Sequence, residues 1–302
     1  MSPVLYDPFS VRFPDNQYKQ GLSNIMTYGR TRNPIQGGRA KSLPGMQFRF
    51  LMKNGFTLIT ERDASGIMKG ALGELAGFLN GARTLDELET YGCPRYYWER
   101  WVTREKCEHF GLSEGDLGSA SYGALWHSFP SRDGTPFNQI ENLVRQMREK
   151  PELLTHRIVP WYPPEIIGPQ GTRRVVVAPC HGDVQVTLFP ETHELILDHV
   201  QRSGDVPVGI VNNLVQYAAL GMILAKLTGY TFTEYVFTIR DAHIYECQYD
   251  AVAQLLSADN GTFPTVTLSD DAPDDIFAFR PHHFVLSDYF PNGPKMKIAT
   301  PT

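Results

Sequence analysis

The sequence predicts a single compact domain of the α/β class. Its 302 residues are 42% hydrophobic and 12% aromatic, which is enough to fill a sizeable core. Segments with helical periodicity alternate with segments of strand character between residues 47 and 245. No linker, internal repeat or low-complexity stretch separates them, so one domain is the simplest interpretation.

Composition narrows the classes of partner and the expected location. A formal net charge of -5 and an isoelectric point near 6.0 argue against a duplex nucleic acid as the main partner. There is no run of about 18 apolar residues and no signal-peptide pattern, so we expect a cytoplasmic protein without membrane association. Four scattered cysteines suit neither a disulfide scaffold nor a zinc site. We therefore expect no metal, and at least one cysteine is a candidate reactive thiol.

The first segments predict an arm, a hairpin and a helix. Residues 1–45 are rich in Pro, Gly, Asn and Arg, which indicates an ordered arm with a basic loop before a domain over residues 46–302. Alternating apolar residues over 47–60, interrupted by a Lys-Asn-Gly turn, are typical of a hairpin. Apolar residues recur at helical spacing over 65–79 and place Glu74 on or beside the buried face.

The later segments continue the alternation. Cys180 falls between two of the predicted strands, so its thiol is expected at a strand end. A rigid, non-helical stretch with two consecutive prolines covers residues 161–164. Apolar patterns predict helices over 136–147 and 213–228, and strands over 173–179, 183–189, 194–200 and 235–244.

Reactive residue types are densest between residues 178 and 245. The segments are Pro179-Cys180-His181, then Gln201 to Asp205, then Gly209 to Asn213, and finally Asp241 to Tyr245. Each segment alone is a weak signal, but their order and spacing together are specific. This order resembles the thymidylate synthase and pyrimidine hydroxymethylase family. Landmarks at residues 73–79, 98–101 and 115–123 extend the resemblance over most of the chain from about residue 42.

The resemblance has consequences for fold, substrates and assembly. It implies an α/β (α+β) domain with a large mixed β-sheet flanked by helices. It also implies transfer of a one-carbon unit from methylene-tetrahydrofolate to carbon 5 of a pyrimidine nucleoside monophosphate. A symmetric homodimer with a shared active site is implied as well.

Cys180 is the first candidate catalytic residue. A thiolate can add to carbon 6 of a pyrimidine ring and make carbon 5 nucleophilic. The resemblance places Arg202 beside this thiol, where its charge would lower the thiol pKa and also meet the substrate phosphate. A lone intracellular cysteine is more often a small buried hydrophobic residue, and the ordered motifs reverse that preference.

Asn213 is the candidate reader of the base. Its amide offers an acceptor and donors, which matches the carbonyl oxygen and ring N–H of uracil together. Relatives that act on cytosine usually carry Asp there, so Asn213 favours dUMP. The alternative is that Asn213, or Asn212, simply caps the following helix.

Further roles follow from the resemblance alone. Glu74 would act through a bound water as acid and base, a role that suits a buried carboxyl with a raised pKa. Tyr122 would help to remove the carbon 5 proton, and Trp98 would pack against the methylene intermediate, although core packing is an equal alternative for both. The remaining candidates are Ser203, Gln201, His181, His243, Tyr245, Arg157 and Arg39 for the nucleotide, Trp101 for the folate, and Asp205 for both catalysis and the folate. Arg30 and Arg32 compete with Arg39 for the phosphate-loop role.

Departures from the family pattern concern the second half of the reaction. Val211-Asn212 replaces the usual Pro-Phe, Ile239-Arg240 replaces two glycines beside the folate, and the tail over 297–302 is altered. These changes make exclusion of water less complete, which favours addition of water over hydride transfer. We therefore expect hydroxymethylation, with reductive methylation as the alternative.

Other classes are less well supported by the residues. A zinc deaminase needs a second cysteine three residues after the first, and His181-Gly182-Asp183 follows Cys180 instead. A cysteine hydrolase would have no marked oxyanion hole. A non-catalytic nucleotide-binding relative is the main alternative outside enzymes, and the joint presence of Cys180, Arg202, Asn213 and Glu74 argues against it.

Overall fold

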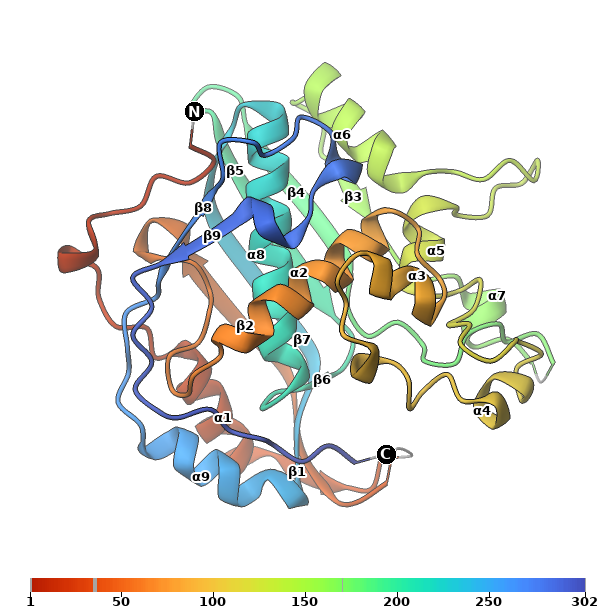
Figure 1. Ribbon diagram of the computed structural model, residues 1–302, viewed down its shortest axis with the longest axis horizontal. Helices are drawn as coiled ribbons and strands as arrows, with labels where there is room; N and C mark the ends of the chain where they lie inside the picture. The colour runs from red at the N-terminus through yellow and green to blue at the C-terminus, as the bar shows by residue number, and fades with distance from the viewer. Residues whose placement is uncertain (1, 35–36, 170, 302) are drawn as a thin grey trace.

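A computed structural model describes residues 2–34, 37–169 and 171–301 of the chain (Figure 1). Its largest feature is a seven-stranded sheet within the described residues. The strands are β1 (Arg30–Arg32), β2 (Ala40–Leu51), β3 (Arg157–Ile158), β4 (Asp183–Phe189), β5 (Glu194–Gln201), β6 (Gly204–Asp205) and β7 (Thr231–Tyr245). β8 (Thr265–Leu268) and β9 (Phe284–Ser287) form a separate antiparallel pair.

The large sheet is mixed, as expected. Its order is β1-β2-β7-β5-β4-β3, and β6 pairs with β7 beside this path. β7 runs parallel to β5 and β6, whereas the other neighbouring strands are antiparallel. Successive side chains of a strand point to opposite faces of the sheet, and in β5 one face is buried. Leu195, Leu197 and His199 are fully buried on that face, and the residues between them are partly exposed.

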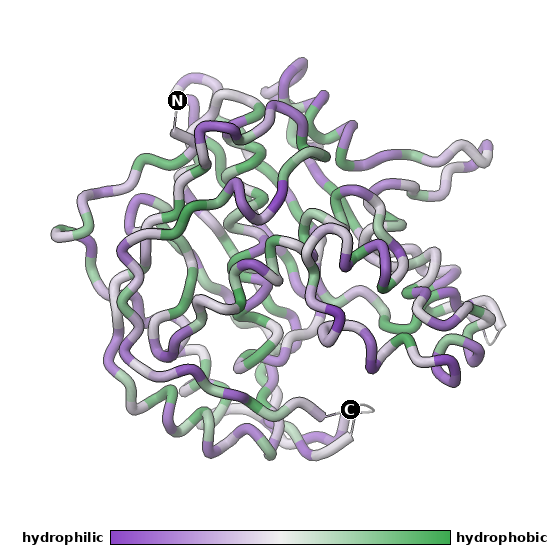
Figure 2. The backbone as a smooth tube through the Cα atoms, viewed as in Figure 1, coloured by the Kyte–Doolittle hydropathy of each residue, from purple (hydrophilic) through white to green (hydrophobic). Residues whose placement is uncertain are grey.

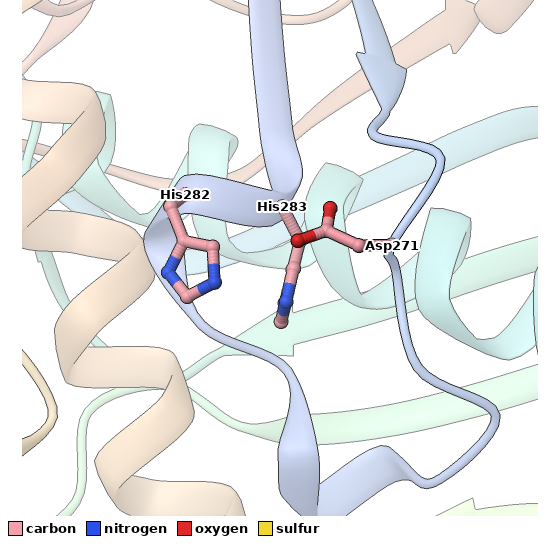
Figure 3. Close-up of side chains that lie close together, drawn as sticks. All are labelled: Asp271, His282 and His283. Atoms are coloured by element: carbon pink, nitrogen blue, oxygen red, sulfur yellow. The ribbon is translucent and has the colours of Figure 1, made fainter.

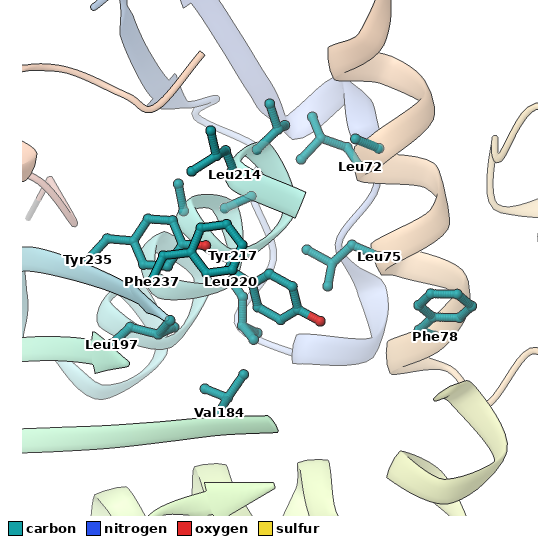
Figure 4. Close-up of a cluster of buried hydrophobic side chains, with 14 of the residues drawn as sticks. Leu72, Leu75, Phe78, Val184, Leu197, Leu214, Tyr217, Leu220, Tyr235 and Phe237 are labelled. Atoms are coloured by element: carbon teal, nitrogen blue, oxygen red, sulfur yellow. The ribbon is translucent and has the colours of Figure 1, made fainter. Parts of the chain in front are cut away.

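Helices cover the buried face of the sheet. In Figure 1, α8 crosses in front of the strands and α2 crosses in front of α8. Figure 4 shows Leu72 and Leu75 of α2 near Leu214 and Leu220 of α8 in the core. The helices are α1 (Gln17–Tyr28), α2 (Ser65–Leu79), α3 (Leu85–Thr90), α4 (Arg104–Glu108), α5 (Tyr122–His127), α6 (Gln139–Glu149), α7 (Pro163–Ile166), α8 (Gly209–Thr228) and α9 (Tyr249–Ser257).

Short 3-10 helices complete the secondary structure. They are Phe9–Val11, Met52–Asn54, Arg95–Tyr97, Glu246–Gln248, Ile276–Ala278 and Pro281–His283.

α8 is a long apolar helix, and its length and composition would allow it to cross a membrane. However, 89% of the window that meets this criterion is buried against the rest of the protein, which is the behaviour of a core helix. Figure 2 shows the contrast with the loop between α5 and α6, which projects from the body and is largely hydrophilic.

Two predicted strands are wrong. Residues 56–60 form no strand, and β2 pairs instead with β1 through residues 40–42 and with β7 along most of its length. The buried Phe56 instead donates its backbone N–H to the carbonyl of Pro264 at 2.8 Å. Residues 173–179 likewise form no strand, because β4 has β3 and β5 as neighbours.

The expected boundary at residue 45 is also wrong, since it falls inside β2. α1 buries Tyr18, Leu22 and Ile25 in the same core as Phe48. α1 and the first half of β2 therefore belong to the domain, because their buried side chains pack into its core. Residues 35 and 36 of the expected basic loop lie outside the described residues.

Candidate functional site

Strand register brings the separate sequence motifs to one end of the sheet. Asp183 at the start of β4 lies opposite Val200 near the end of β5. Gln201 pairs with Ile239, and Asp205 pairs with His243. The segment that contains Cys180 therefore lies beside Arg202, with the last residues of β7 next to them.

Cys180 lies just before β4, in a loop of restricted geometry. The chain enters β4 through Gly182, whose φ is 95°. A side chain at Gly182 would place its Cβ 2.9 Å from the ring of Trp126, so only glycine fits without movement. The backbone N–H of Cys180 donates to the hydroxyl of Tyr122 at 2.7 Å. These contacts fix the position of the partly exposed thiol.

The guanidinium of Arg202 lies next to the thiol of Cys180. Its guanidinium donates to the carbonyls of Pro179 and Ala178, each at 3.1 Å, and one nitrogen lies 3.3 Å from Cys180 Sγ. Burial raises the pKa of the Cys180 thiol, and the charge of Arg202 opposes this shift. The sequence argument expected a lowered thiol pKa; in the structure, the cost of burying the charge outweighs the attraction.

A stack of three rings, Phe78, Tyr122 and His181, packs beside Cys180. Tyr122 is buried and stacks on His181 with ring centres 4.3 Å apart and on Phe78 with centres 4.9 Å apart. Nδ1 of His181 lies 2.6 Å from the hydroxyl of Tyr217. Burial lowers the pKa of His181 to about 3, so this ring is neutral near pH 7.

Behind His181 lies a histidine that sequence reasoning missed. His199 is fully buried in β5 and stacks on Tyr217 with ring centres 3.5 Å apart. Its Nε2 accepts the N–H of Gly182 at 3.1 Å, so the proton of the neutral ring is on Nδ1, 3.3 Å from the hydroxyl of Tyr235. The alternation of β5 predicted a buried position for residue 199, but not these partners.

Glu74 occupies the buried face of α2, as its helical spacing predicted. Its carboxyl accepts hydrogen bonds from Trp98 Nε1 at 2.5 Å and from Gln216 Nε2 at 2.6 Å. Burial raises the pKa of Glu74 to about 7, although both hydrogen bonds oppose the shift. A carboxyl with this pKa can both accept and release a proton near neutral pH.

Asn213 is connected to Glu74 through Gln216. Asn213 Nδ2 donates to Gln216 Oε1 at 2.9 Å, and all three side chains are buried. Neither Asn212 nor Asn213 caps α8, because the helix begins at Gly209. Asn212 instead accepts a hydrogen bond from the hydroxyl of Tyr97 at 2.9 Å.

Asp241 organises the candidate phosphate and sugar residues. It accepts hydrogen bonds from Ser42 and from Ser203, the latter at 3.0 Å, and lies 3.6 Å from His243 Nδ1. Burial alone would raise the pKa of Asp241, but the hydrogen bonds outweigh it and hold that pKa well below its usual range. Sequence reasoning named the motif around Asp241 but gave this residue no role.

The other nucleotide candidates gather around the same point. Gln201 donates to the carbonyl of Ser203 at 2.9 Å, and its buried Oε1 has no partner among the described residues. The ring of His243 packs edge to face on Tyr245, with centres 5.1 Å apart. Both side chains are buried.

The basic side chains occupy different places. Arg32 forms an ion pair with Asp241, which places it beside Ser203. Arg39 instead lies 3.9 Å from Glu246, with both side chains exposed. Arg157 pairs with Asp183 through two hydrogen bonds of 3.0 and 2.9 Å. Of these three arginines, Arg32 is the one paired with Asp241, the carboxylate that also accepts from Ser203.

The candidate folate residues lie beside the C-terminal tail. Gln248 donates to both oxygens of Asp205 and to the carbonyl of Ala299 at 2.9 Å. Burial raises the pKa of Asp205 to about 6, and the bond from Gln248 opposes this shift. Arg100 lies over the ring of Trp101 at 4.9 Å, and its buried Nε has no hydrogen-bond partner among the described residues. An unused buried donor beside an aromatic ring fits a flat ligand with carboxylates or carbonyls.

A separate cluster has the residue types of a metal site. Figure 3 shows Asp271, which follows β8, close to His282 and His283. His283 Nδ1 accepts the N–H of Arg280 at 3.0 Å, so in the neutral ring Nε2 carries the proton. A histidine ligand needs a free lone pair on one nitrogen and usually donates from the other. This arrangement does not fit, and we assign no metal there.

Comparison with known families agrees with this geometry. The family model described as "Thymidylate synthase" matches residues 16–300, which includes every site residue discussed above. Members of this family transfer a one-carbon unit from methylene-tetrahydrofolate to dUMP. With most of its length matched, the chain belongs to the thymidylate synthase family.

Proposed function

We propose that this chain is a deoxynucleotide hydroxymethylase that converts dUMP to 5-hydroxymethyl-dUMP, with methylene-tetrahydrofolate as cosubstrate. Membership of the family supports a folate-dependent one-carbon transferase. The observation that carries the finer proposal is the departure from the family pattern at Val211-Asn212 and Ile239-Arg240, which favours access of water to the intermediate. Glu74, a buried carboxyl with a pKa of about 7, is the candidate base for that water. Addition of water needs a base near the reacting carbon, and Glu74 is suited to that task.

The first half of the reaction depends on Cys180. Its thiolate adds to carbon 6 of the uracil ring, and carbon 5 then attacks the one-carbon unit that the folate supplies. Arg202, 3.3 Å from Sγ, stabilises the thiolate before addition. The buried hydroxyl of Tyr122, beside the backbone of Cys180, is the candidate group that helps to remove the carbon 5 proton. Burial raises the pKa of Tyr122 well above its usual value, so the phenol stays neutral and the proton leaves to water.

The second half consumes water. Loss of the carbon 5 proton and departure of tetrahydrofolate leave an exocyclic methylene on the ring. A water oxygen bonds to that carbon, its proton passes to Glu74, and the electron pair returns through the ring to expel the Cys180 thiolate. Polar groups that would hold such a water come from Tyr97 and Asn212, which are hydrogen-bonded to each other. Tyr97 precedes Trp98 in the chain, and Asn212 precedes Asn213.

Reductive methylation of dUMP to dTMP is the second candidate, and one observation favours it. The tail is held by several polar contacts: Arg62 donates to the carbonyl of Met296, Gln248 to that of Ala299, and Arg100 to the Thr300 hydroxyl at 2.6 Å. A tail held in this way would exclude water from the methylene carbon and leave hydride transfer as the outcome.

The deciding experiment incubates the purified protein with dUMP and methylene-tetrahydrofolate, then measures the nucleotide mass and the folate absorbance. Addition of CH2O with tetrahydrofolate returned supports the hydroxymethylase. Addition of CH2 with dihydrofolate formed would instead establish a thymidylate synthase.

A non-catalytic relative would give neither product. The matched control is Cys180→Ser, which keeps the shape of the site but lacks a thiolate. We expect this variant to bind dUMP and to lose turnover by about a thousandfold or more. Turnover at the wild-type rate would contradict the role of Cys180 as nucleophile.

A further inference from the structure

We propose that Gln216 is a positioning residue that fixes the side-chain amide of Asn213 in one orientation and thereby selects uracil over cytosine. The inference rests on the proposed function in one respect: it takes Asn213 as the reader of the base. It does not depend on whether the product is methyl or hydroxymethyl.

The orientation of Gln216 is set by a backbone carbonyl. Gln216 Nε2 lies 3.3 Å from the carbonyl oxygen of Ala71 and 2.6 Å from Glu74 Oε2. A backbone carbonyl can only accept a hydrogen bond, so Gln216 must present its amide nitrogen to α2. Flipping the amide would bring two acceptors together at Ala71 in a buried place, which is costly.

The same logic passes from Gln216 to Asn213. With its nitrogen committed to α2, Gln216 presents Oε1 to Asn213, and an amide oxygen can only accept. Asn213 must therefore direct Nδ2 toward Gln216, 2.9 Å away. The carbonyl of Ala71 thus determines the orientation of Asn213 through two successive amides. One N–H of Asn213 and its Oδ1 remain for a ligand.

This fixed orientation distinguishes the two bases. Asn213 Nδ2 lies on the side of Gln216 and Glu74, so the remaining N–H faces the ring substituent nearest Glu74. In the proposed reaction Glu74 serves the carbon attached to carbon 5, so the neighbouring substituent that can face Asn213 is the one at carbon 4. Uracil presents an acceptor oxygen there and a ring N–H to Oδ1, so both contacts form. Cytosine presents an amino group and a bare ring nitrogen, so both contacts fail.

The test compares binding of dUMP and of dCMP to the full chain by titration calorimetry. Gln216→Met removes the acceptor that holds Asn213, so we expect the ratio of the two affinities to fall by about tenfold or more. Retention of the preference for dUMP in Gln216→Met would overturn the inference.

A second readout separates positioning from a general loss of structure. Gln216→Met removes one hydrogen bond from the Glu74 carboxylate, so the acidic limb of the pH profile should move to higher pH. The control is Gln139→Met: Gln139 is also buried, and it donates to the carbonyls of Leu125 and Val159, both at 2.8 Å. We expect this control to lower the melting temperature without changing the affinity ratio.

The remaining outcomes are also informative. If Gln216→Met does not fold, Gln216→Ser replaces it, because a serine hydroxyl is too short to reach Asn213 and should give the same fall in the ratio. An unchanged ratio in that variant counts against Gln216. Wild-type protein that binds neither nucleotide would overturn the proposed function, and the inference with it.

Discussion

At the scale of single residues, Arg202 governs how readily Cys180 loses its proton. Removing its charge leaves burial unopposed, so the thiol pKa should rise in Arg202→Met. We expect alkylation of Cys180 by iodoacetamide at pH 8 to slow severalfold. The background should carry Cys247→Ser, because Cys247 is the exposed cysteine, while Cys93 and Cys107 are buried.

The matched control for that measurement is Arg104→Met. Arg104 is an exposed arginine that pairs with Glu114, so its loss changes the net charge equally without touching the thiol. Alkylation in this control should proceed at the wild-type rate. Equal slowing in both variants would mean that Arg202 acts only through the overall charge.

Glu74 should make the protein less stable at alkaline pH. Its folded-state pKa of about 7 lies above the ordinary value of 4.5, so the folded state holds the proton more tightly than the unfolded state. The stability contributed by the protonated carboxyl is present at low pH and is lost as the pH rises through 7. Between pH 5 and pH 8, wild type should lose roughly 2–3 kcal/mol relative to Glu74→Gln, measured by urea unfolding. Parallel curves for the two proteins would contradict the raised pKa.

Sequence reasoning found the residues that carry reactive groups, because those groups lie in compact, ordered motifs. It missed the residues whose importance comes from contacts between separate elements. Gln216 links α2 to α8, and His199 accepts from Gly182 across the sheet. Asp241 joins Ser42, Ser203 and Arg32, which are far apart in the chain. No local pattern marks such residues before the topology is known.

At the scale of elements, the close approach of α2 to a neighbouring loop positions Glu74. A Cβ on Gly73 would lie 2.3 Å from the backbone of Gly92, which cannot move aside as a flexible side chain could. We expect Gly73→Ala to push α2 away, to cost about 2–4 kcal/mol in urea unfolding, and to reduce turnover through displacement of Glu74.

The control lies in the same helix. Gly66 is exposed near the start of α2, and a Cβ there would meet no atom within 4 Å. Gly66→Ala should therefore stabilise the protein by about 0.5–1 kcal/mol through higher helix propensity. Destabilisation by both substitutions would point to a general intolerance of α2 rather than to the contact with Gly92.

The elements themselves differed in how well the sequence predicted them. The long amphipathic or apolar segments over 65–79, 136–147 and 213–228 are confirmed as α2, α6 and α8, with shifted ends for the last two. Helical periodicity depends on one chain segment only, so it can be read locally. A strand also needs a neighbour to pair with, and residues 56–60 and 173–179 have strand-like patterns but pair with no strand of the sheet.

At the scale of the whole molecule, the face of the large sheet that the helices do not cover has features of a subunit interface. Gln47, Arg49 and Leu51 of β2 are exposed on the face opposite to the buried Phe48 and Phe50. On β5, Asp198 has a buried carboxylate oxygen without a hydrogen-bond partner among the described residues. An orphaned acceptor on an open sheet face is what a symmetric dimer would satisfy. We propose that the chain forms a homodimer through this face, which light scattering of the purified protein would test.

Sharing of the active site across that dimer can be tested by mixing inactive variants. We predict that Cys180→Ser and Arg157→Ala are each nearly inactive alone. Subunit exchange between them should restore activity, because one site of each hybrid would combine an intact Cys180 with an intact Arg157 from the other subunit.

The control mixture combines Cys180→Ser with Glu74→Ala. Cys180 and Glu74 belong to one subunit's site, where Tyr122 binds the backbone of Cys180 and stacks on Phe78 of the helix that carries Glu74. Every site in this hybrid would lack one of the two groups, so the mixture should stay inactive. If the Arg157 mixture also stays inactive after exchange is complete, then Arg157 serves its own chain, where it already pairs with Asp183.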